Sequence, residues 1–225
     1  MDMDAAVERL YERVDLVRGA GDRWRGQLCL MSLVALLAGE PHNDSPLTAS
    51  PLIRSFGMVI NDEMPMAMRQ RLKPFAPRII RTRDGRDRER AKLLADAWRM
   101  ELVPRVLEDF GDQAGATDRR TEALLSCRLV TTAAASAERL GWAVAKLIAH
   151  YARRAGYRRH DWYWLKSIDL LDRLSDVHSH KLPNHYAADR VRVANLVLDQ
   201  SSRVSGPSGE CCSARHRSFV PAGRS

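Results

Sequence analysis

Acidic and imidazole side chains alternate along one short segment of this sequence. Glu40, His42 and Asp44 stand at every second position after an apolar run. Asp62 follows a second apolar segment. Carboxylates and an imidazole that converge from two helix ends can bind a divalent cation or act as an acid–base pair. We therefore take these four residues as the candidate catalytic site of a metal-assisted hydrolase, with the metal, any cofactor and the substrate undefined.

Turn and capping chemistry explains the same residue types without a catalytic site. Asp44 and the asparagine before it are typical of Asx turns. Asp62 can cap a helix that begins near Pro65. Glu40 can pair with an arginine such as Arg69. The sequence leaves both interpretations open.

Three histidines gather in a second polar segment, "DVHSHKLPNHY". His178, His180 and His185 lie close to Asp176, and three imidazoles with one open position suit zinc. On a helix end, however, residues two apart do not share a face. A polar loop between helices accounts for the same composition, so metal binding by this cluster stays open.

A basic and aromatic segment, "YARRAGYRRHDWYW", is the candidate nucleic-acid interface. The chain has a formal net charge of +8 and a pI near 9.7. Arginines beside aromatic rings can combine phosphate contacts with base stacking. The same arginines suit the C-terminal end of a helix, where cations interact favourably with the dipole. No signature of sequence-specific readout is present, so the candidates for non-specific binding are Arg153, Arg154, Tyr157, Arg158 and Arg159.

Several functional classes lack their fingerprints here. The chain has no GxGxxG, P-loop or GxSxG motif, so the usual nucleotide-binding and hydrolase signatures are absent. Its four cysteines form no CxxC pair, and the N-terminus begins acidic, unlike a secretory signal. The apolar run 28–38 is shorter than the roughly 20 residues that span a bilayer. We expect a cytoplasmic protein without a membrane segment.

The elements that position these residues are predicted to be helices. Apolar residues at helical spacing predict an amphipathic helix over 4–18. Asp22 can cap a second helix, 23–38, which Gly39 and Pro41 end. That helix is apolar on nearly all sides, which is typical of the centre of a bundle. We expect it to pack beneath the alanine-rich helix further along the chain.

Prolines mark the starts and interruptions of the next helices. Ser50 and Pro51 predict the start of a helix that ends near residue 61. A second proline-led start follows, and Pro74 and Pro77 must interrupt whatever helix it forms. The spacing then predicts a helix from the 82–87 loop to residue 110, which Pro104 bends or breaks.

Long periodic segments make up the second half of the chain. Helices are predicted over 118–156, 160–177 and 184–200. No period-2 strand is found. The fold class is therefore all-α, a single bundle-like domain of about seven helices over residues 1–199. Residues 200–225 lack periodicity and are rich in Ser, Gly and Arg, which predicts a disordered basic tail.

A set of short motifs spans residues 29–85. It reads Cys-Leu-Met, Leu-Ala-Gly-Glu, Asp-x-Pro, Asn-Asp and Arg-Gln before a proline-rich stretch, at residues 29–31, 37–40, 44–46, 61–62 and 69–70. In these motifs the chain resembles a family of uncharacterised bacterial proteins of actinobacteria and some proteobacteria. The resemblance covers about a quarter of the chain and implies a shared all-helical domain. No activity is assigned to that family, so the resemblance implies no reaction.

Dense helical amphipathicity without a catalytic fingerprint favours an interaction protein. Our first hypothesis is a cytoplasmic helical module for protein–protein interaction, with a protein partner or a second copy of itself. The metal-assisted hydrolase and the non-specific nucleic-acid binder are the two alternatives. Fold class alone does not decide between them, because unrelated functions share helical scaffolds.

Overall fold

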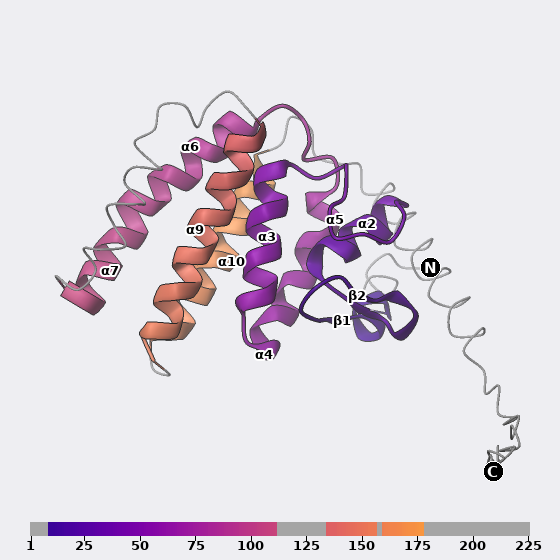
Figure 1. The fold of residues 1–225 in the computed structure, drawn as a ribbon, viewed down its shortest axis with the longest axis horizontal. Coiled ribbons are helices and arrows are strands. Elements are labelled where there is room, and N and C mark those ends of the chain that lie inside the picture. Colours follow the sequence, from indigo (N-terminus) through magenta and orange to yellow (C-terminus); the bar gives the residue numbers. More distant parts are fainter. Residues whose placement is uncertain (1–8, 112–133, 157–158, 178–225) are drawn as a thin grey trace, which may run out of the picture.

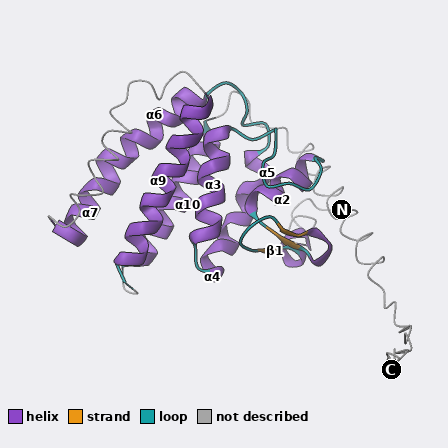
Figure 2. Ribbon diagram, viewed as in Figure 1, coloured by secondary structure: helices purple, strands orange, loops and turns teal. Residues whose placement is uncertain are grey.

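The computed structural model describes residues 9–111, 134–156 and 159–177. Over these residues the chain is all-α, as predicted, with one small sheet near the N-terminus (Figures 1 and 2). Residues 118–133 of one predicted helix, the predicted helix over 184–200 and the predicted tail lie outside the described residues. Within the described part, no helix combines the length and the apolar character needed to cross a membrane.

The N-terminal segment departs most from its prediction. The described part of the first helix ends at Arg13, not near residue 18. Asp22 caps only a 3₁₀ turn, η1 (Arg23–Arg25), so the predicted helix start at residue 23 is wrong. Three two-residue strands follow instead, β1 (Asp15–Leu16), β2 (Gly21–Asp22) and β3 (Gln27–Leu28), in the order β1-β3-β2. β3 runs parallel to β1 and antiparallel to β2.

The apolar helix α2 (Leu30–Ala38) is shorter than predicted and almost wholly buried. The Cys29 sulfur accepts a hydrogen bond from the Ser32 N–H at 3.2 Å and so caps its start. Gly39 ends the helix in the left-handed conformation, with φ of 73°, as predicted. Its main helical contacts are with α3 (Pro51–Glu63) and α5 (Ala76–Ile79), and not with the alanine-rich helix.

Prolines shape the chain between α3 and α5 as predicted. Ser50 accepts a hydrogen bond from the Ile53 N–H, and Pro51 occupies the first turn of α3. Pro74 lies inside a 3₁₀ stretch and Pro77 in the first turn of α5. The chain therefore bends here, because proline cannot continue a helix without losing a hydrogen bond. The pieces between α3 and α5 are α4 (Met66–Arg69) and η2 (Gln70–Phe75).

One continuous curved rod follows, drawn in magenta to pink in Figure 1. α6 (Asp87–Ala97) passes into a π-helical stretch, η3 (Trp98–Leu102), and then into α7 (Val103–Phe110). Pro104 falls in the first turn of α7, where its missing N–H is tolerated. The chain therefore does not break at Pro104. It takes π-helical hydrogen bonding over the five residues of η3 and then continues as α7.

The body of the bundle consists of α3, α9 (Ala134–Arg154) and α10 (His160–Asp176), with α6 and α7 beside them (Figure 1). α3 and α9 run in the same direction. Ser55 donates to the Glu138 carbonyl near the start of both helices, and Lys146 pairs with Glu63 further along. α10 runs in the opposite direction to α3 and α9. Its end lies beside the start of α6, where Arg90 donates to the Leu174 carbonyl.

Close approach of two helices fixes the centre of this bundle. A Cβ on Gly141 of α9 would lie 2.4 Å from the Leu52 carbonyl oxygen of α3, so no larger residue fits. Further along α9, Val144 and Ile148 are buried and form an apolar stripe on one face of the helix.

Candidate functional site

The polar turn after α2 folds through its own side chains. The Glu40 carboxylate accepts hydrogen bonds from the N–H groups of Leu47 at 2.8 Å and Thr48 at 3.0 Å. Asn43 accepts one from the Ser45 N–H at 2.8 Å, which is an Asx turn. Glu40 therefore orders the segment that leads into α3, as the turn interpretation expects, although its partners are backbone amides and not Arg69.

The other predicted catalytic residues do not assemble a site with Glu40. His42 is exposed and Asp44 is half-buried on the turn. Asp62 lies in the last turn of α3, roughly 16 Å from Pro51 at the helical rise per residue. Over the described residues, no three His, Cys, Asp or Glu side chains are grouped so that they could hold a metal ion. The His178, His180 and His185 cluster lies outside those residues.

Asp62 fixes the loop that follows β1. Its Oδ1 accepts a hydrogen bond from the Gly19 N–H at 3.0 Å, and its carbonyl oxygen accepts one from the Arg18 guanidinium at 2.5 Å. It does not cap α4, whose N-cap is Pro65 without a side-chain hydrogen bond. Both contacts span more than 40 residues of sequence, so local pattern could not reveal them.

The Asn-Asp and Arg-Gln motifs hold the N-terminal sheet onto α3. Asn61 is fully buried; its Oδ1 accepts from the Leu30 N–H at 3.1 Å and its Nδ2 donates to the Val17 carbonyl at 2.8 Å. Gln70 accepts from the N–H of Leu16 at 3.0 Å and donates to its carbonyl at 2.9 Å, as a neighbouring strand would. These motif residues therefore stabilise the fold.

Arg69 has the same kind of role. It is buried, and its guanidinium donates to the carbonyls of Asn61 at 2.6 Å and Met64 at 2.9 Å. Both carbonyls lie at the end of α3, where the helix leaves them without intrahelical partners. Burial lowers the pKa of Arg69, and Arg18 lowers it further. The cation caps α3 and is not part of a substrate site.

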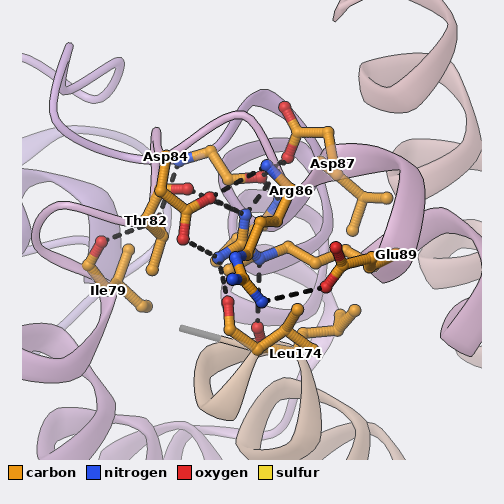
Figure 3. Close-up of polar contacts among 12 residues, drawn as sticks. Ile79, Thr82, Asp84, Arg86, Asp87, Glu89 and Leu174 are labelled. Atoms are coloured by element: carbon orange, nitrogen blue, oxygen red, sulfur yellow. Dashed lines mark hydrogen bonds and ion pairs between the residues drawn. The ribbon is translucent and has the colours of Figure 1, made fainter. Parts of the chain in front are cut away.

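Arg90 forms a second buried polar hub, whose partners Thr82, Asp84 and Leu174 are labelled in Figure 3. Its side chain is 0% exposed and donates two hydrogen bonds to the Asp84 carboxylate, at 2.7 and 2.9 Å. It also donates to the carbonyls of Thr82 at 2.8 Å and Leu174 at 3.2 Å. The hub joins the loop before α6 to the end of α10. Its hydrogen bonds are internal to the protein, so we assign it to stability.

The basic segment predicted to bind nucleic acid is largely engaged within the protein. Arg153 pairs with Glu63. The Arg154 guanidinium lies 5.0 Å from the centre of the Phe110 ring. Arg159 pairs with Asp109 at 2.8 Å. Tyr157 and Arg158 lie outside the described residues. The three described arginines therefore have internal partners, which leaves less positive charge for phosphate.

Asp109 binds Arg159 together with two other hydrogen-bond donors. Its side chain is 1% exposed and accepts hydrogen bonds from Arg105 at 3.0 Å, Arg159 at 2.8 Å and the Tyr163 hydroxyl at 2.9 Å. Burial, followed by the hydrogen bond to Asp109, raises the pKa of Tyr163. A neutral phenol that donates to a buried carboxylate connects α7 to α10, and the Tyr151 ring stacks beside it.

An open groove runs between α3 and α9 on the surface. We call it the α3–α9 groove; its volume is about 490 Å³. Met58 and Val59 of α3 and Ala143 of α9 give it an apolar floor. Trp142 forms a wall and is 53% exposed. The remaining lining is polar or charged and comprises Ser55, Asp62, Glu138, Arg139 and Lys146.

Two ion pairs hold parts of the groove rim in place. Lys146 pairs with Glu63 at 2.6 Å and lies 5.8 Å from the centre of the Trp142 ring. Hydrogen bonding by Lys146 lowers the pKa of Glu63, against the effect of burial. Glu138 pairs with Arg54 of α3 at 3.2 Å. Trp142 is thus oriented by a cation that is itself fixed to α3.

Sequence reasoning did not single out the α3–α9 groove. One signal was present, because Trp142 lies off the apolar stripe that Leu140, Val144 and Ile148 trace along α9. A large aromatic residue on the polar face of a helix adds exposed apolar surface, which indicates a contact site when neighbouring apolar residues extend it into a patch. The contribution of Met58 from α3 could not be inferred, since it depends on how α3 packs beside α9.

Comparison with protein-family models, with curated proteins and with solved structures finds no match to this chain. The resemblance to a bacterial family therefore stays a prediction.

Proposed function

We propose that this chain is a helical interaction module that binds a protein partner through the α3–α9 groove. The observation that carries the proposal is the half-exposed indole of Trp142 beside an apolar floor. Tryptophan dominates many binding interfaces because its large ring is desolvated on contact. An apolar centre within a charged rim is the usual anatomy of such an interface.

The two alternatives gain less support from the described residues. A metal-assisted hydrolase needs converging ligands, and Glu40 and Asp62 have separate roles in folding. A nucleic-acid interface needs free cations, and Arg153 and Arg159 have acidic partners. A cytoplasmic setting is part of the proposal and is supported by the spacing of the four cysteines, which form no CxxC pair and no pattern of a secreted disulfide framework. The bacterial family that the chain resembles adds a shared domain to this proposal and no reaction.

An apolar fluorescent anion, 1-anilinonaphthalene-8-sulfonate, tests whether the α3–α9 groove binds ligands. The folded protein at low concentration is titrated with this probe, whose ring matches the apolar floor and whose sulfonate matches Arg139 and Lys146. We expect saturable binding with a stoichiometry of one. Trp142→Ala and Met58→Asp should each abolish it, because both residues line the groove that would bind the probe.

A matched control separates the groove from general surface stickiness. Met100 is 77% exposed on η3 and does not line the groove, so Met100→Ala should bind the probe like the unaltered protein. Equal binding by the two groove variants and the control would overturn the proposed function. Far-UV circular dichroism of each variant shows that the fold is intact.

A further inference from the structure

The polar and charged residues of the α3–α9 groove lie in two groups, one at each end of the groove. Ser55, Glu138 and Arg139 lie at the end where both helices begin, and Asp62 and Lys146 lie at the other end. Trp142 lies between them on α9. Since α3 and α9 run in the same direction, one end of the groove lies at the start of both helices and the other end lies further along both.

One charge at each end has no ion-pair partner among the described residues. Arg139 is exposed, and over the part of the chain that the structure describes its side chain donates one hydrogen bond, to Ser136 of its own helix at 3.4 Å. Asp62 accepts hydrogen bonds from Gly19 and Asn61 through Oδ1. Its Oδ2 accepts none from residues that the structure describes. The Arg18 guanidinium donates to the backbone carbonyl of Asp62, and the buried Arg69 interacts with Asp62 electrostatically, but neither forms an ion pair with its carboxylate among the described residues. The other rim charges are already paired, Glu138 with an arginine of α3 and Lys146 with a glutamate of α3.

Opposite unpaired charges at the two ends make this surface complementary to itself. A second copy rotated by 180° about an axis near Trp142 places Arg139 opposite the other copy's Asp62, and the reverse pair forms at the far end. A contact of this kind uses the same patch on both subunits, which is the arrangement of a two-fold dimer. Arginine and carboxylate then form charge-assisted hydrogen bonds.

We infer that the α3–α9 groove binds a second copy of this chain in a two-fold dimer. The inference rests on the proposed function and names the partner. The two Trp142 indoles cover each other's apolar floors at the centre, and the two Arg139–Asp62 pairs set the orientation at the ends. A nucleic acid fits this surface poorly, because it needs a rim of one sign, and the rim here carries both.

Charge reversal tests the orientation directly. Sedimentation velocity over a wide range of protein concentration should show a reversible dimer for the unaltered chain. Arg139→Glu alone and Asp62→Lys alone each place like charges opposite each other, so each should weaken the dimer by about tenfold or more. An equimolar mixture of the two variants should restore it, because both pairs in the mixed dimer again have opposite signs.

A control variant and a substitute variant accompany this test. Arg88→Glu makes the same charge change on α6, away from the groove lining, and should leave the dimer intact. Asp62→Lys also removes the acceptor for Gly19. If that variant does not fold, Arg139→Glu with Asp62→Asn serves in its place. It removes the repulsion, keeps an oxygen for Gly19, and should dimerise more tightly than Arg139→Glu alone.

Three outcomes would overturn the inference. These are a monomer at every concentration, a dimer that Arg139→Glu leaves unchanged, and a mixture of the two variants that stays monomeric. The fluorescent anion distinguishes this failure from failure of the proposed function. If the chain stays monomeric, saturable probe binding that Trp142→Ala abolishes would support the proposed function with a different partner. No probe binding at concentrations where sedimentation shows a monomer would remove both proposals.

Discussion

Removing the carboxylate that faces Arg90 should destabilise the protein far more than removing an exposed one. In Asp84→Ala, the guanidinium loses two charge-assisted hydrogen bonds but stays buried, with 0% of its side chain exposed. The carbonyls of Thr82 and Leu174 still accept from it, and Asp87 lies 3.6 Å away. The variant therefore retains a buried charge with incomplete compensation.

The magnitude follows from what remains around that charge. Breaking a buried ion pair by removing one partner costs about 3–5 kcal/mol. We expect about 3 kcal/mol for Asp84→Ala, at the low end, because the carbonyls and Asp87 continue to compensate Arg90. The exposed pair between Lys92 and Asp96 is the matched control, with side chains 79% and 47% exposed. Asp96→Ala should cost about 0.5 kcal/mol or less.

Urea denaturation followed by far-UV circular dichroism measures both losses. A difference of about 2 kcal/mol or more between the variants in the free energy of unfolding supports the buried hub. Similar small losses for Asp84→Ala and Asp96→Ala would refute the reasoning, because they would mean that Arg90 is hydrated. An unchanged slope against urea concentration confirms that the same surface unfolds.

Acid titration of stability checks the same hub independently. Burial raises the pKa of Asp84, but hydrogen bonds from Arg90 outweigh it, and the folded-state pKa lies below its usual value. The stability that this contributes is present above the unfolded pKa and is lost as the pH falls through the folded pKa. Unfolding at neutral and at acid pH should therefore show a smaller acid loss in Asp84→Asn than in the unaltered protein. An equal loss would contradict the ion pair.

Three further predictions concern the framework around the groove. Asn61→Ala removes the acceptor for Leu30 and the donor to the sheet, and should lower the free energy of unfolding by about 2 kcal/mol in urea titrations; a loss below about 0.5 kcal/mol would contradict its role. Gly141→Ala adds a Cβ 2.4 Å from the Leu52 carbonyl oxygen and should cost about 1–3 kcal/mol, with unchanged thermal stability as the contrary result. Burial opposes ionisation of Glu101, but hydrogen bonds from two cations of α10 lower its pKa. Glu101→Gln should therefore lose less of its free energy of unfolding in acid than the unaltered protein does. An identical dependence of that free energy on pH in the two proteins would refute this.

Local signals in the sequence predicted the helices that depend on local chemistry. Ser50 and Pro51 start α3 and Gly39 ends α2, because caps act within one helical turn. In the segment 15–28, residues 15–18 and 23–28 were predicted as parts of two helices separated at Gly19 and Gly21. Its strands are two residues long and depend on Asn61 and Gln70, which lie more than 40 positions away in sequence.

The candidate sites show the same limit. Alternation of Glu40, His42 and Asp44 indicated chemistry, but the Glu40 carboxylate is used by backbone amides of its own turn. The same residue types serve both roles, so composition does not distinguish them. The α3–α9 groove arises where α3 packs beside α9, and only Trp142, off the apolar stripe of its helix, signalled it. Tertiary packing therefore decided the site, as it did the small sheet.

The fluorine NMR signal of Trp142 tests the central claim most directly. The protein is labelled with 5-fluorotryptophan, and Trp142→Phe identifies the resonance by its absence. We predict that this resonance shifts with protein concentration as the second copy covers the α3–α9 groove, while that of Trp98, which is 1% exposed, stays constant. A Trp142 resonance that does not change from the lowest to the highest concentration would contradict the account.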